Sequence, residues 1–119
     1  MQRYNKEKRM LRGTLMLSIE LIKLMCQKGA VNPTSHILRR MVQRKISLAS
    51  IVFALEAGEI IEHYIDNEGD ESCLVLCWLT TNYPIHIVCA LDGDELNMIT
   101  AYRPSLLEWH EGFKTRRQF

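Results

Sequence analysis

The sequence predicts an α+β domain in which two to three N-terminal helices pack on an antiparallel sheet of about four strands. Two observations lead to this class. Apolar residues recur at helical spacing as far as residue 58, and the pattern then changes to short runs rich in β-branched and aromatic residues. The 119 residues suit one domain with its own core. We therefore expect a flexible basic arm over residues 1–13 and a single domain over residues 14–119.

The first expected helix covers about residues 14–27, because leucine and methionine recur there at helical spacing and Gly29 follows the last turn. The second covers the segment "SHILRRMVQR". Its N-cap is left open between three residues that could accept a hydrogen bond from the first turn: Asn32, Thr34 and Ser35.

The third expected helix lies in "SLASIVFALEAG". Ser47 is its natural N-cap, and Gly58 stands where a left-handed residue would end it. Four strand-like runs follow, separated by the turn signals "DNEGDE", "TNYP" and "DGDE". They cover residues 59–65, 72–80, 84–91 and 96–102. The last segment, 105–119, is expected to hold a short helix and a basic tail.

The composition excludes several classes of function. The net charge is only +1, so any contact with nucleic acid must depend on where the charge lies. Basic residues open the chain, but Glu20 and Lys23 interrupt the apolar run that follows, so we expect no export signal and no membrane span. The sequence also lacks a glycine-rich phosphate loop and a hydrolase nucleophile on a tight turn.

The four cysteines favour buried free thiols in a reducing cytoplasm, since no Cys-x-x-Cys pair occurs. Cys73 and Cys77 share one face of a strand, but four residues place them about 13 Å apart. That separation is too large for two ligands of one zinc ion. We expect no metal and no cofactor.

The helix over "SHILRRMVQR" divides into two faces. Ile37, Leu38, Met41 and Val42 lie on one side, and the polar residues lie on the other. His36, Arg40 and Arg44 then form a ridge at positions i, i+4 and i+8. Such a ridge can be an ordinary solvated face, or it can bind the phosphates of RNA.

His86 stands in the apolar run "PIHIVCA", where a histidine is costly unless it is hydrogen-bonded or lies at a cleft. Two registers of the last hairpin remain open. A two-residue turn at Asp92-Gly93 pairs His86 with Ile99, whereas a three-residue loop pairs it with Thr100. The register decides whether His86 can share a site with other polar residues.

Four motifs in a fixed order resemble one family of small bacterial and archaeal proteins. They are "H-x-x-x-R-M-x-x-R-x-I" at 36–46, "G-E-I-I-E-x-Y" at 58–64, "P-I-H-I-V" at 84–88 and "I-T-A-Y-R-P…W" at 99–109. The chain resembles the family catalogued as Domain of Unknown Function four-two-five-eight over about residues 17–117. The resemblance implies a RelE-like or BrnT-like fold, found in small ribonuclease toxins, and a YgiT-type zinc-finger protein as antitoxin partner.

The resulting hypothesis is a cytoplasmic toxin that cleaves RNA without a metal ion. Arginines would bind the phosphate, and histidine or tyrosine would transfer protons. The predicted catalytic residues are His86, His36, Arg40 and Tyr102. The predicted RNA-binding residues are Arg44, Arg39, Tyr64, Thr100, Arg103, Arg116 and Arg117, while Trp109 is expected to stack or pack. The alternative is a module of the same fold that binds RNA or a partner protein without cleavage.

Overall fold

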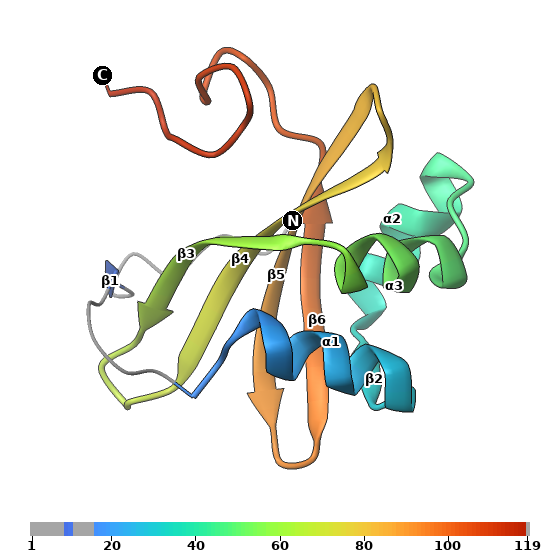
Figure 1. Cartoon of the computed structure of the whole chain (residues 1–119), viewed down its shortest axis with the longest axis vertical. Helices are drawn as coiled ribbons and strands as arrows, with labels where there is room; N and C mark the ends of the chain where they lie inside the picture. The colour runs from blue at the N-terminus through green and yellow to red at the C-terminus, as the bar shows by residue number, and fades with distance from the viewer. Residues whose placement is uncertain (1–8, 11–15, 119) are drawn as a thin grey trace.

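The computed structural model describes residues 9–10 and 16–118. Three helices and a six-stranded sheet make up the described chain (Figure 1). The elements are, in chain order, β1 (Arg9–Met10), α1 (Ile19–Lys28), β2 (Val31–Pro33), α2 (Ser35–Arg44), α3 (Leu48–Glu56), β3 (Glu59–Ile65), β4 (Glu71–Thr80), β5 (Tyr83–Asp92) and β6 (Glu95–Tyr102). The predicted α+β class is confirmed, and the four long strands lie within one residue of their expected bounds.

Local capping sets the helix ends. Ser18 accepts a hydrogen bond from the Leu21 backbone N–H at 3.1 Å, so α1 begins later than its periodicity predicts. Gly29, at φ 71°, ends the helix in the left-handed conformation. Ser47 caps α3 as predicted, through the Ser50 backbone N–H.

The predicted role of Gly58 as a left-handed helix end is wrong, because Ala57 is the C-cap and Gly58 does not have a positive φ. Gly58 is needed for close packing instead. A Cβ atom at this position would lie 2.7 Å from Cγ1 of Val75 on β4. The glycine therefore allows the chain to pass close to the sheet as it enters β3.

The sheet has the strand order β1-β3-β4-β5-β6-β2 and is mixed, not purely antiparallel, because β2 runs parallel to β6. The sequence offered no signal for β2, since three residues that include an asparagine and a proline show no strand periodicity. The predicted arm over residues 1–13 lies outside the described residues, apart from Arg9–Met10, which pair with β3.

The observed register of β5 and β6 is neither of the two alternatives. Asp92 pairs with Glu95 across a two-residue turn, and a bulge at Ile99 then shifts the pairing by one residue. His86 consequently lies opposite Tyr102, and Val88 lies opposite Thr100. Side chains directly opposite each other project from the same face of the sheet.

Each face of the sheet has its own apolar core. The larger core joins the helices to the sheet through residues such as Ile22, Ile37 and Ile51. A smaller core on the other face gathers Trp109 and its neighbours beneath the C-terminal segment. This segment, red in Figure 1, leaves the end of β6 and turns away from the helices. It contains turns and one bridge between Trp109 and Arg116, so the predicted short helix is absent from its described part.

Candidate nucleic-acid interface

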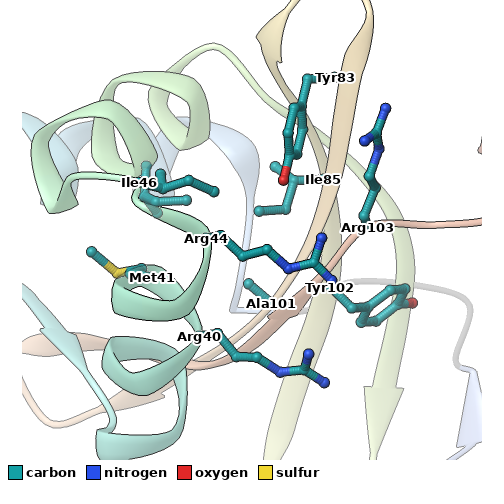
Figure 2. Close-up of a pocket in the computed structure, with 10 residues that line it drawn as sticks. Arg40, Met41, Arg44, Ile46, Tyr83, Ile85, Ala101, Tyr102 and Arg103 are labelled. Carbon is teal, nitrogen blue, oxygen red and sulfur yellow. The ribbon is translucent and has the colours of Figure 1, made fainter.

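A narrow cleft with a volume of about 30 Å³ lies between α2 and the adjoining ends of β5 and β6. Its floor is apolar and includes Met41, Ile85 and Ala101. Its polar lining consists of three arginines and two tyrosines: Arg40, Arg44, Arg103, Tyr83 and Tyr102. Figure 2 shows Arg40 and Arg44 reaching from α2 toward the strands. No carboxylate belongs to this lining, as far as the chain is described.

Thr34 fixes α2 beside β6. Its hydroxyl accepts a hydrogen bond from the Ile37 backbone N–H, which makes Thr34 the N-cap of α2. The same hydroxyl donates to the carbonyl of Ile99 at 2.7 Å, at the bulge of β6. The Thr34 backbone N–H also donates to the Met98 carbonyl. This one residue therefore starts the helix and ties it to the strand that carries Tyr102.

The amphipathic pattern of α2 determines the direction in which its arginine side chains point. Ile37 and Met41 are buried, so residues on the opposite side face outward. Arg40 and Arg44 are one turn apart and enter the same cleft, as the i, i+4 spacing predicts. The predicted ridge therefore exists in the folded chain, at least for Arg40 and Arg44, which lie side by side in the cleft.

Arg103 and Tyr83 complete the cleft from the strands. The Arg103 guanidinium lies 4.3 Å from the centre of the Tyr83 ring, in cation–π contact. It also donates a hydrogen bond to the Asn82 carbonyl at 3.3 Å. In Figure 2 the Tyr83 hydroxyl points into the space between Ile85 and Arg44. Tyr83 is a residue that sequence reasoning missed, since its only signal was a place in the turn "TNYP".

A second basic hollow adjoins the first and shares Arg40 with it. It is lined by His36, Arg39, Arg40 and Gln43. Burial lowers the pKa of His36, and the charges of Arg40 and Arg39 lower it further. The imidazole is therefore neutral at pH 7, the form that a general base requires. His36, Arg39, Arg40 and Arg44 thus lie along one side of α2.

His86 lies on the opposite face of the sheet and is fully buried. Its Nε2 lies 2.8 Å from the Phe113 carbonyl, which can only accept, so Nε2 carries the proton. Nδ1 consequently accepts from the Tyr102 hydroxyl at 3.0 Å. The Trp109 ring packs edge-on against the imidazole, with the ring centres 4.4 Å apart. Both nitrogens are engaged, and burial lowers the pKa of His86 to about 4.

Tyr102 lies at the border between the two faces. It is among the residues at the edge of the arginine cleft, but in Figure 2 its ring points away from the cleft, and its hydroxyl donates to His86. Burial raises the pKa of Tyr102, so the phenol keeps its proton at neutral pH. The structure thus brings two predicted catalytic residues together, but it places them in a buried pair away from Arg40.

Arg116 and Arg117 hold the C-terminal segment in place. Arg116 makes a two-pronged ion pair with the buried carboxylate of Glu62, at 2.8 and 3.0 Å. It also stacks on Trp109 at 4.6 Å and donates to the Tyr64 hydroxyl. Arg117 donates to the carbonyls of Leu106 and Trp109. These residues, predicted to bind RNA, lie apart from the cleft.

Thr100 is buried on β6, and it does not line the cleft. Two buried polar atoms lack a hydrogen-bond partner among the described residues: Oγ1 of Thr100 and Nε2 of His36. An unpaired buried polar atom costs free energy.

The cysteines are free and buried, as predicted. Burial raises the pKa of Cys26 to about 11 and that of Cys77 to about 12, so these thiols stay protonated at neutral pH. Within the described ranges, no three residues of the His, Cys, Asp and Glu types are arranged to hold a metal ion. None of the described helices is long and apolar enough to cross a membrane.

Comparison with known proteins gives one result. No curated protein matches the chain, and no solved structure does. One family model, described as "Domain of unknown function (DUF4258)", matches residues 34–103. This segment begins at the N-cap of α2 and ends at Arg103, so it contains every residue that lines the arginine cleft. Because the match covers more than half of the chain, the protein belongs to the DUF4258 family.

Proposed function

We propose that this protein is a metal-independent endoribonuclease that holds an RNA phosphodiester in the cleft between α2 and β6. The observation that carries the proposal is the convergence of Arg40, Arg44 and Arg103 on one cleft whose described lining contains no carboxylate. Arginine presents a planar set of donors that matches phosphate oxygens, and its charge stabilises the extra negative charge of the transition state.

The step needs one base and one acid. The ribose 2′-hydroxyl loses its proton and attacks phosphorus, and the bond from phosphorus to the 5′-oxygen breaks as that oxygen gains a proton. The products are a 2′,3′-cyclic phosphate and a 5′-hydroxyl. His36 is neutral at pH 7 and would accept the first proton. Tyr83, whose hydroxyl points into the cleft, would donate the second.

This assignment differs from the sequence hypothesis at His86. A general base needs a lone pair within reach of the substrate, and both nitrogens of His86 are already engaged in a buried site. The proposal therefore gives His86 and Tyr102 a structural role and leaves the chemistry to the residues around Arg40.

The test uses short single-stranded RNA with a chelator present. We expect cleavage to 2′,3′-cyclic phosphate ends, reduced at least about a hundred-fold in the double variant Arg40→Ala, Arg44→Ala. Lys23→Ala is a control, because Lys23 is an exposed cation on α1 that does not line the cleft. Cleavage that survives the double variant unchanged would place the active site elsewhere.

The second candidate is an RNA-binding module without cleavage. One observation favours it: His86 is fully buried and both of its ring nitrogens are hydrogen-bonded within the protein, so this histidine is not available for proton transfer. Under this function the double variant loses salt-dependent binding, and the wild type yields no product.

We further propose a biological role as the cytoplasmic toxin of a toxin–antitoxin pair, with a YgiT-type zinc-finger protein as its partner. This role rests on the resemblance to RelE-like and BrnT-like toxins. Expression in a bacterial host should arrest growth, and Arg40→Ala with Arg44→Ala should relieve the arrest while the protein stays soluble. Growth that continues with soluble wild-type protein would contradict the toxin role.

A further inference from the structure

We propose that a hollow beside the arginine cleft binds one unpaired base of a single-stranded RNA. It is formed by the tip of the β4–β5 hairpin, the end of β6 and the C-terminal segment. Its lining consists of Trp78, Thr81, Asn82, Pro84, Arg103, Pro104, Leu106 and Phe113. This inference rests on the proposed function, since it adds a base site to the phosphate site.

Continuity with the cleft is the first argument. Arg103 lines both hollows. In Figure 1 the tip of the β4–β5 hairpin rises between α2 and α3 on one side and the C-terminal segment on the other. A strand whose phosphate contacts Arg103 from the α2 side therefore has an adjoining apolar hollow across β6. Alternation of phosphate charge and apolar base along a nucleic-acid strand matches this pair of surfaces.

Trp78 is the second argument. Its side chain is 44% exposed, whereas Trp109, the other tryptophan of the chain, is 2% exposed. Phe113 packs against the Trp78 ring in a T-shaped arrangement, with the ring centres 6.1 Å apart and the planes at 66°. A T-shaped contact with one ring covers at most one face of the indole, so a half-exposed indole keeps a face on which a base can stack.

Asn82 and Thr81 add hydrogen-bonding groups at the same place. The Asn82 backbone is already engaged, because its carbonyl accepts from Arg103 and its N–H donates to the Thr80 hydroxyl. The side-chain amide of Asn82 has no partner among the described residues. An amide offers both a donor and an acceptor, the combination that reads the edge of an unpaired base.

A duplex would not fit this surface, since its bases are stacked on each other and unavailable to Trp78. The occupant is therefore a base in a single strand, or one displaced from its stack. Trp78 positions the substrate by stacking, and Asn82 is the residue that would determine base preference.

The experiment measures binding of 2′-O-methyl hexauridylate and hexaadenylate, which cannot be cleaved through the 2′-oxygen. A ribose-phosphate hexamer without bases serves as the third probe. We expect both RNA probes to quench tryptophan fluorescence of the wild type and to leave Trp78→Phe, which retains only Trp109, unquenched. Trp78→Ala should bind the RNA probes about ten-fold more weakly. Its affinity for the abasic strand should be unchanged.

Phe53→Ala is the matched control, because Phe53 is an aromatic residue on α3, 76% exposed, that does not line the hollow. Trp78→Tyr should restore binding, since the aromatic face returns. If Trp78→Ala fails to fold, Trp78→Leu removes the aromatic face and keeps the bulk.

Two results would overturn the inference, and they are distinguishable. RNA binding that depends on Arg40 and Arg44 but is equal in Trp78→Ala and Phe53→Ala would refute the base site and leave the phosphate site standing. A wild type that binds neither RNA nor the abasic strand would refute the proposed function, and the base site with it.

Discussion

The two faces of the sheet near the end of β6 hold the same kinds of side chain in different surroundings. On the helix side, Arg40, Arg44 and Arg103 converge on a cleft, and no carboxylate lines it in the part of the chain that the structure describes. On the other side, Arg116 is bound to the carboxylate of Glu62, and His86 has a partner at each nitrogen. Polar groups paired inside the protein stabilise the fold, whereas several cations gathered around one cleft attract an anion.

The two faces also show that a histidine pKa can be lowered in a purely structural setting or beside a possible binding site. His86 has a strongly lowered pKa because it is buried, and its partners are groups of the fold itself. His36 has a lowered pKa in a basic hollow next to the arginine cleft. A shifted pKa marks a candidate functional residue only where a substrate can reach it. His36 lines a hollow, whereas His86 is fully buried with both ring nitrogens hydrogen-bonded, so this criterion favours His36 as the proton acceptor.

The largest expected effect is on the paired side. His86→Ala removes a buried ring and leaves both the Phe113 carbonyl and the Tyr102 hydroxyl without their partner. We expect a loss of about 4 kcal/mol in the free energy of unfolding, measured with urea. His110→Ala, at an exposed position of the same segment, should change it by less than about 0.5 kcal/mol. Equal losses in the two variants would contradict the structural role of His86.

The pH dependence of stability comes next. The pKa of His86 is about 4 in the folded protein, below its ordinary value of 6.5, so the unfolded chain binds the proton more readily. Stability is therefore complete above pH 6.5 and falls as the pH drops from 6.5 to 4, by about 3 kcal/mol from this group. Urea unfolding across this range should show the slope in the wild type and in His110→Gln. A slope that persists undiminished in His86→Gln would assign it to other groups.

Two arginines provide the sharpest contrast. Arg116→Ala leaves the Glu62 carboxylate buried without its ion pair, and we expect a loss of about 2 kcal/mol in the free energy of unfolding. Arg44→Ala should leave stability within about 0.5 kcal/mol and weaken RNA binding about ten-fold. The measurements are urea unfolding and RNA titration at fixed salt. If Arg116→Ala remains folded but Arg44→Ala unfolds, the assignment of the two sides is reversed.

The smallest effect tests Tyr102, which lies at the edge of the cleft but directs its hydroxyl to His86. Tyr102→Phe removes the hydroxyl that donates to His86 and should cost about 1 kcal/mol of stability. RNA cleavage should continue at the wild-type rate, because proton transfer is assigned to His36 and Tyr83. Abolished cleavage with unchanged RNA binding would instead make Tyr102 a catalytic residue, as the sequence hypothesis had it. Tyr83→Phe is the matched variant, in which cleavage should fall.

Local signals in the sequence were sufficient for the elements of the fold. The caps at Ser47 and Gly29, the two faces of α2 and the four long strands all follow from side-chain chemistry within a few residues. The ridge of Arg40 and Arg44 was predictable for the same reason, since residues one turn apart on a helix share a face. The α+β class follows from the change of period at Gly58.

Tertiary structure alone decided which of these residues meet. The bulge at Ile99 moves His86 opposite Tyr102, and no local pattern marks a single extra residue in a strand. The same strand delivers Arg103 to the cleft, and the neighbouring turn adds Tyr83. The C-terminal segment folds back to give His86 its second partner, the Phe113 carbonyl. These are contacts between distant segments, whose geometry depends on how the whole sheet pairs, so the sequence by itself determined the helices and strands but not the site between them.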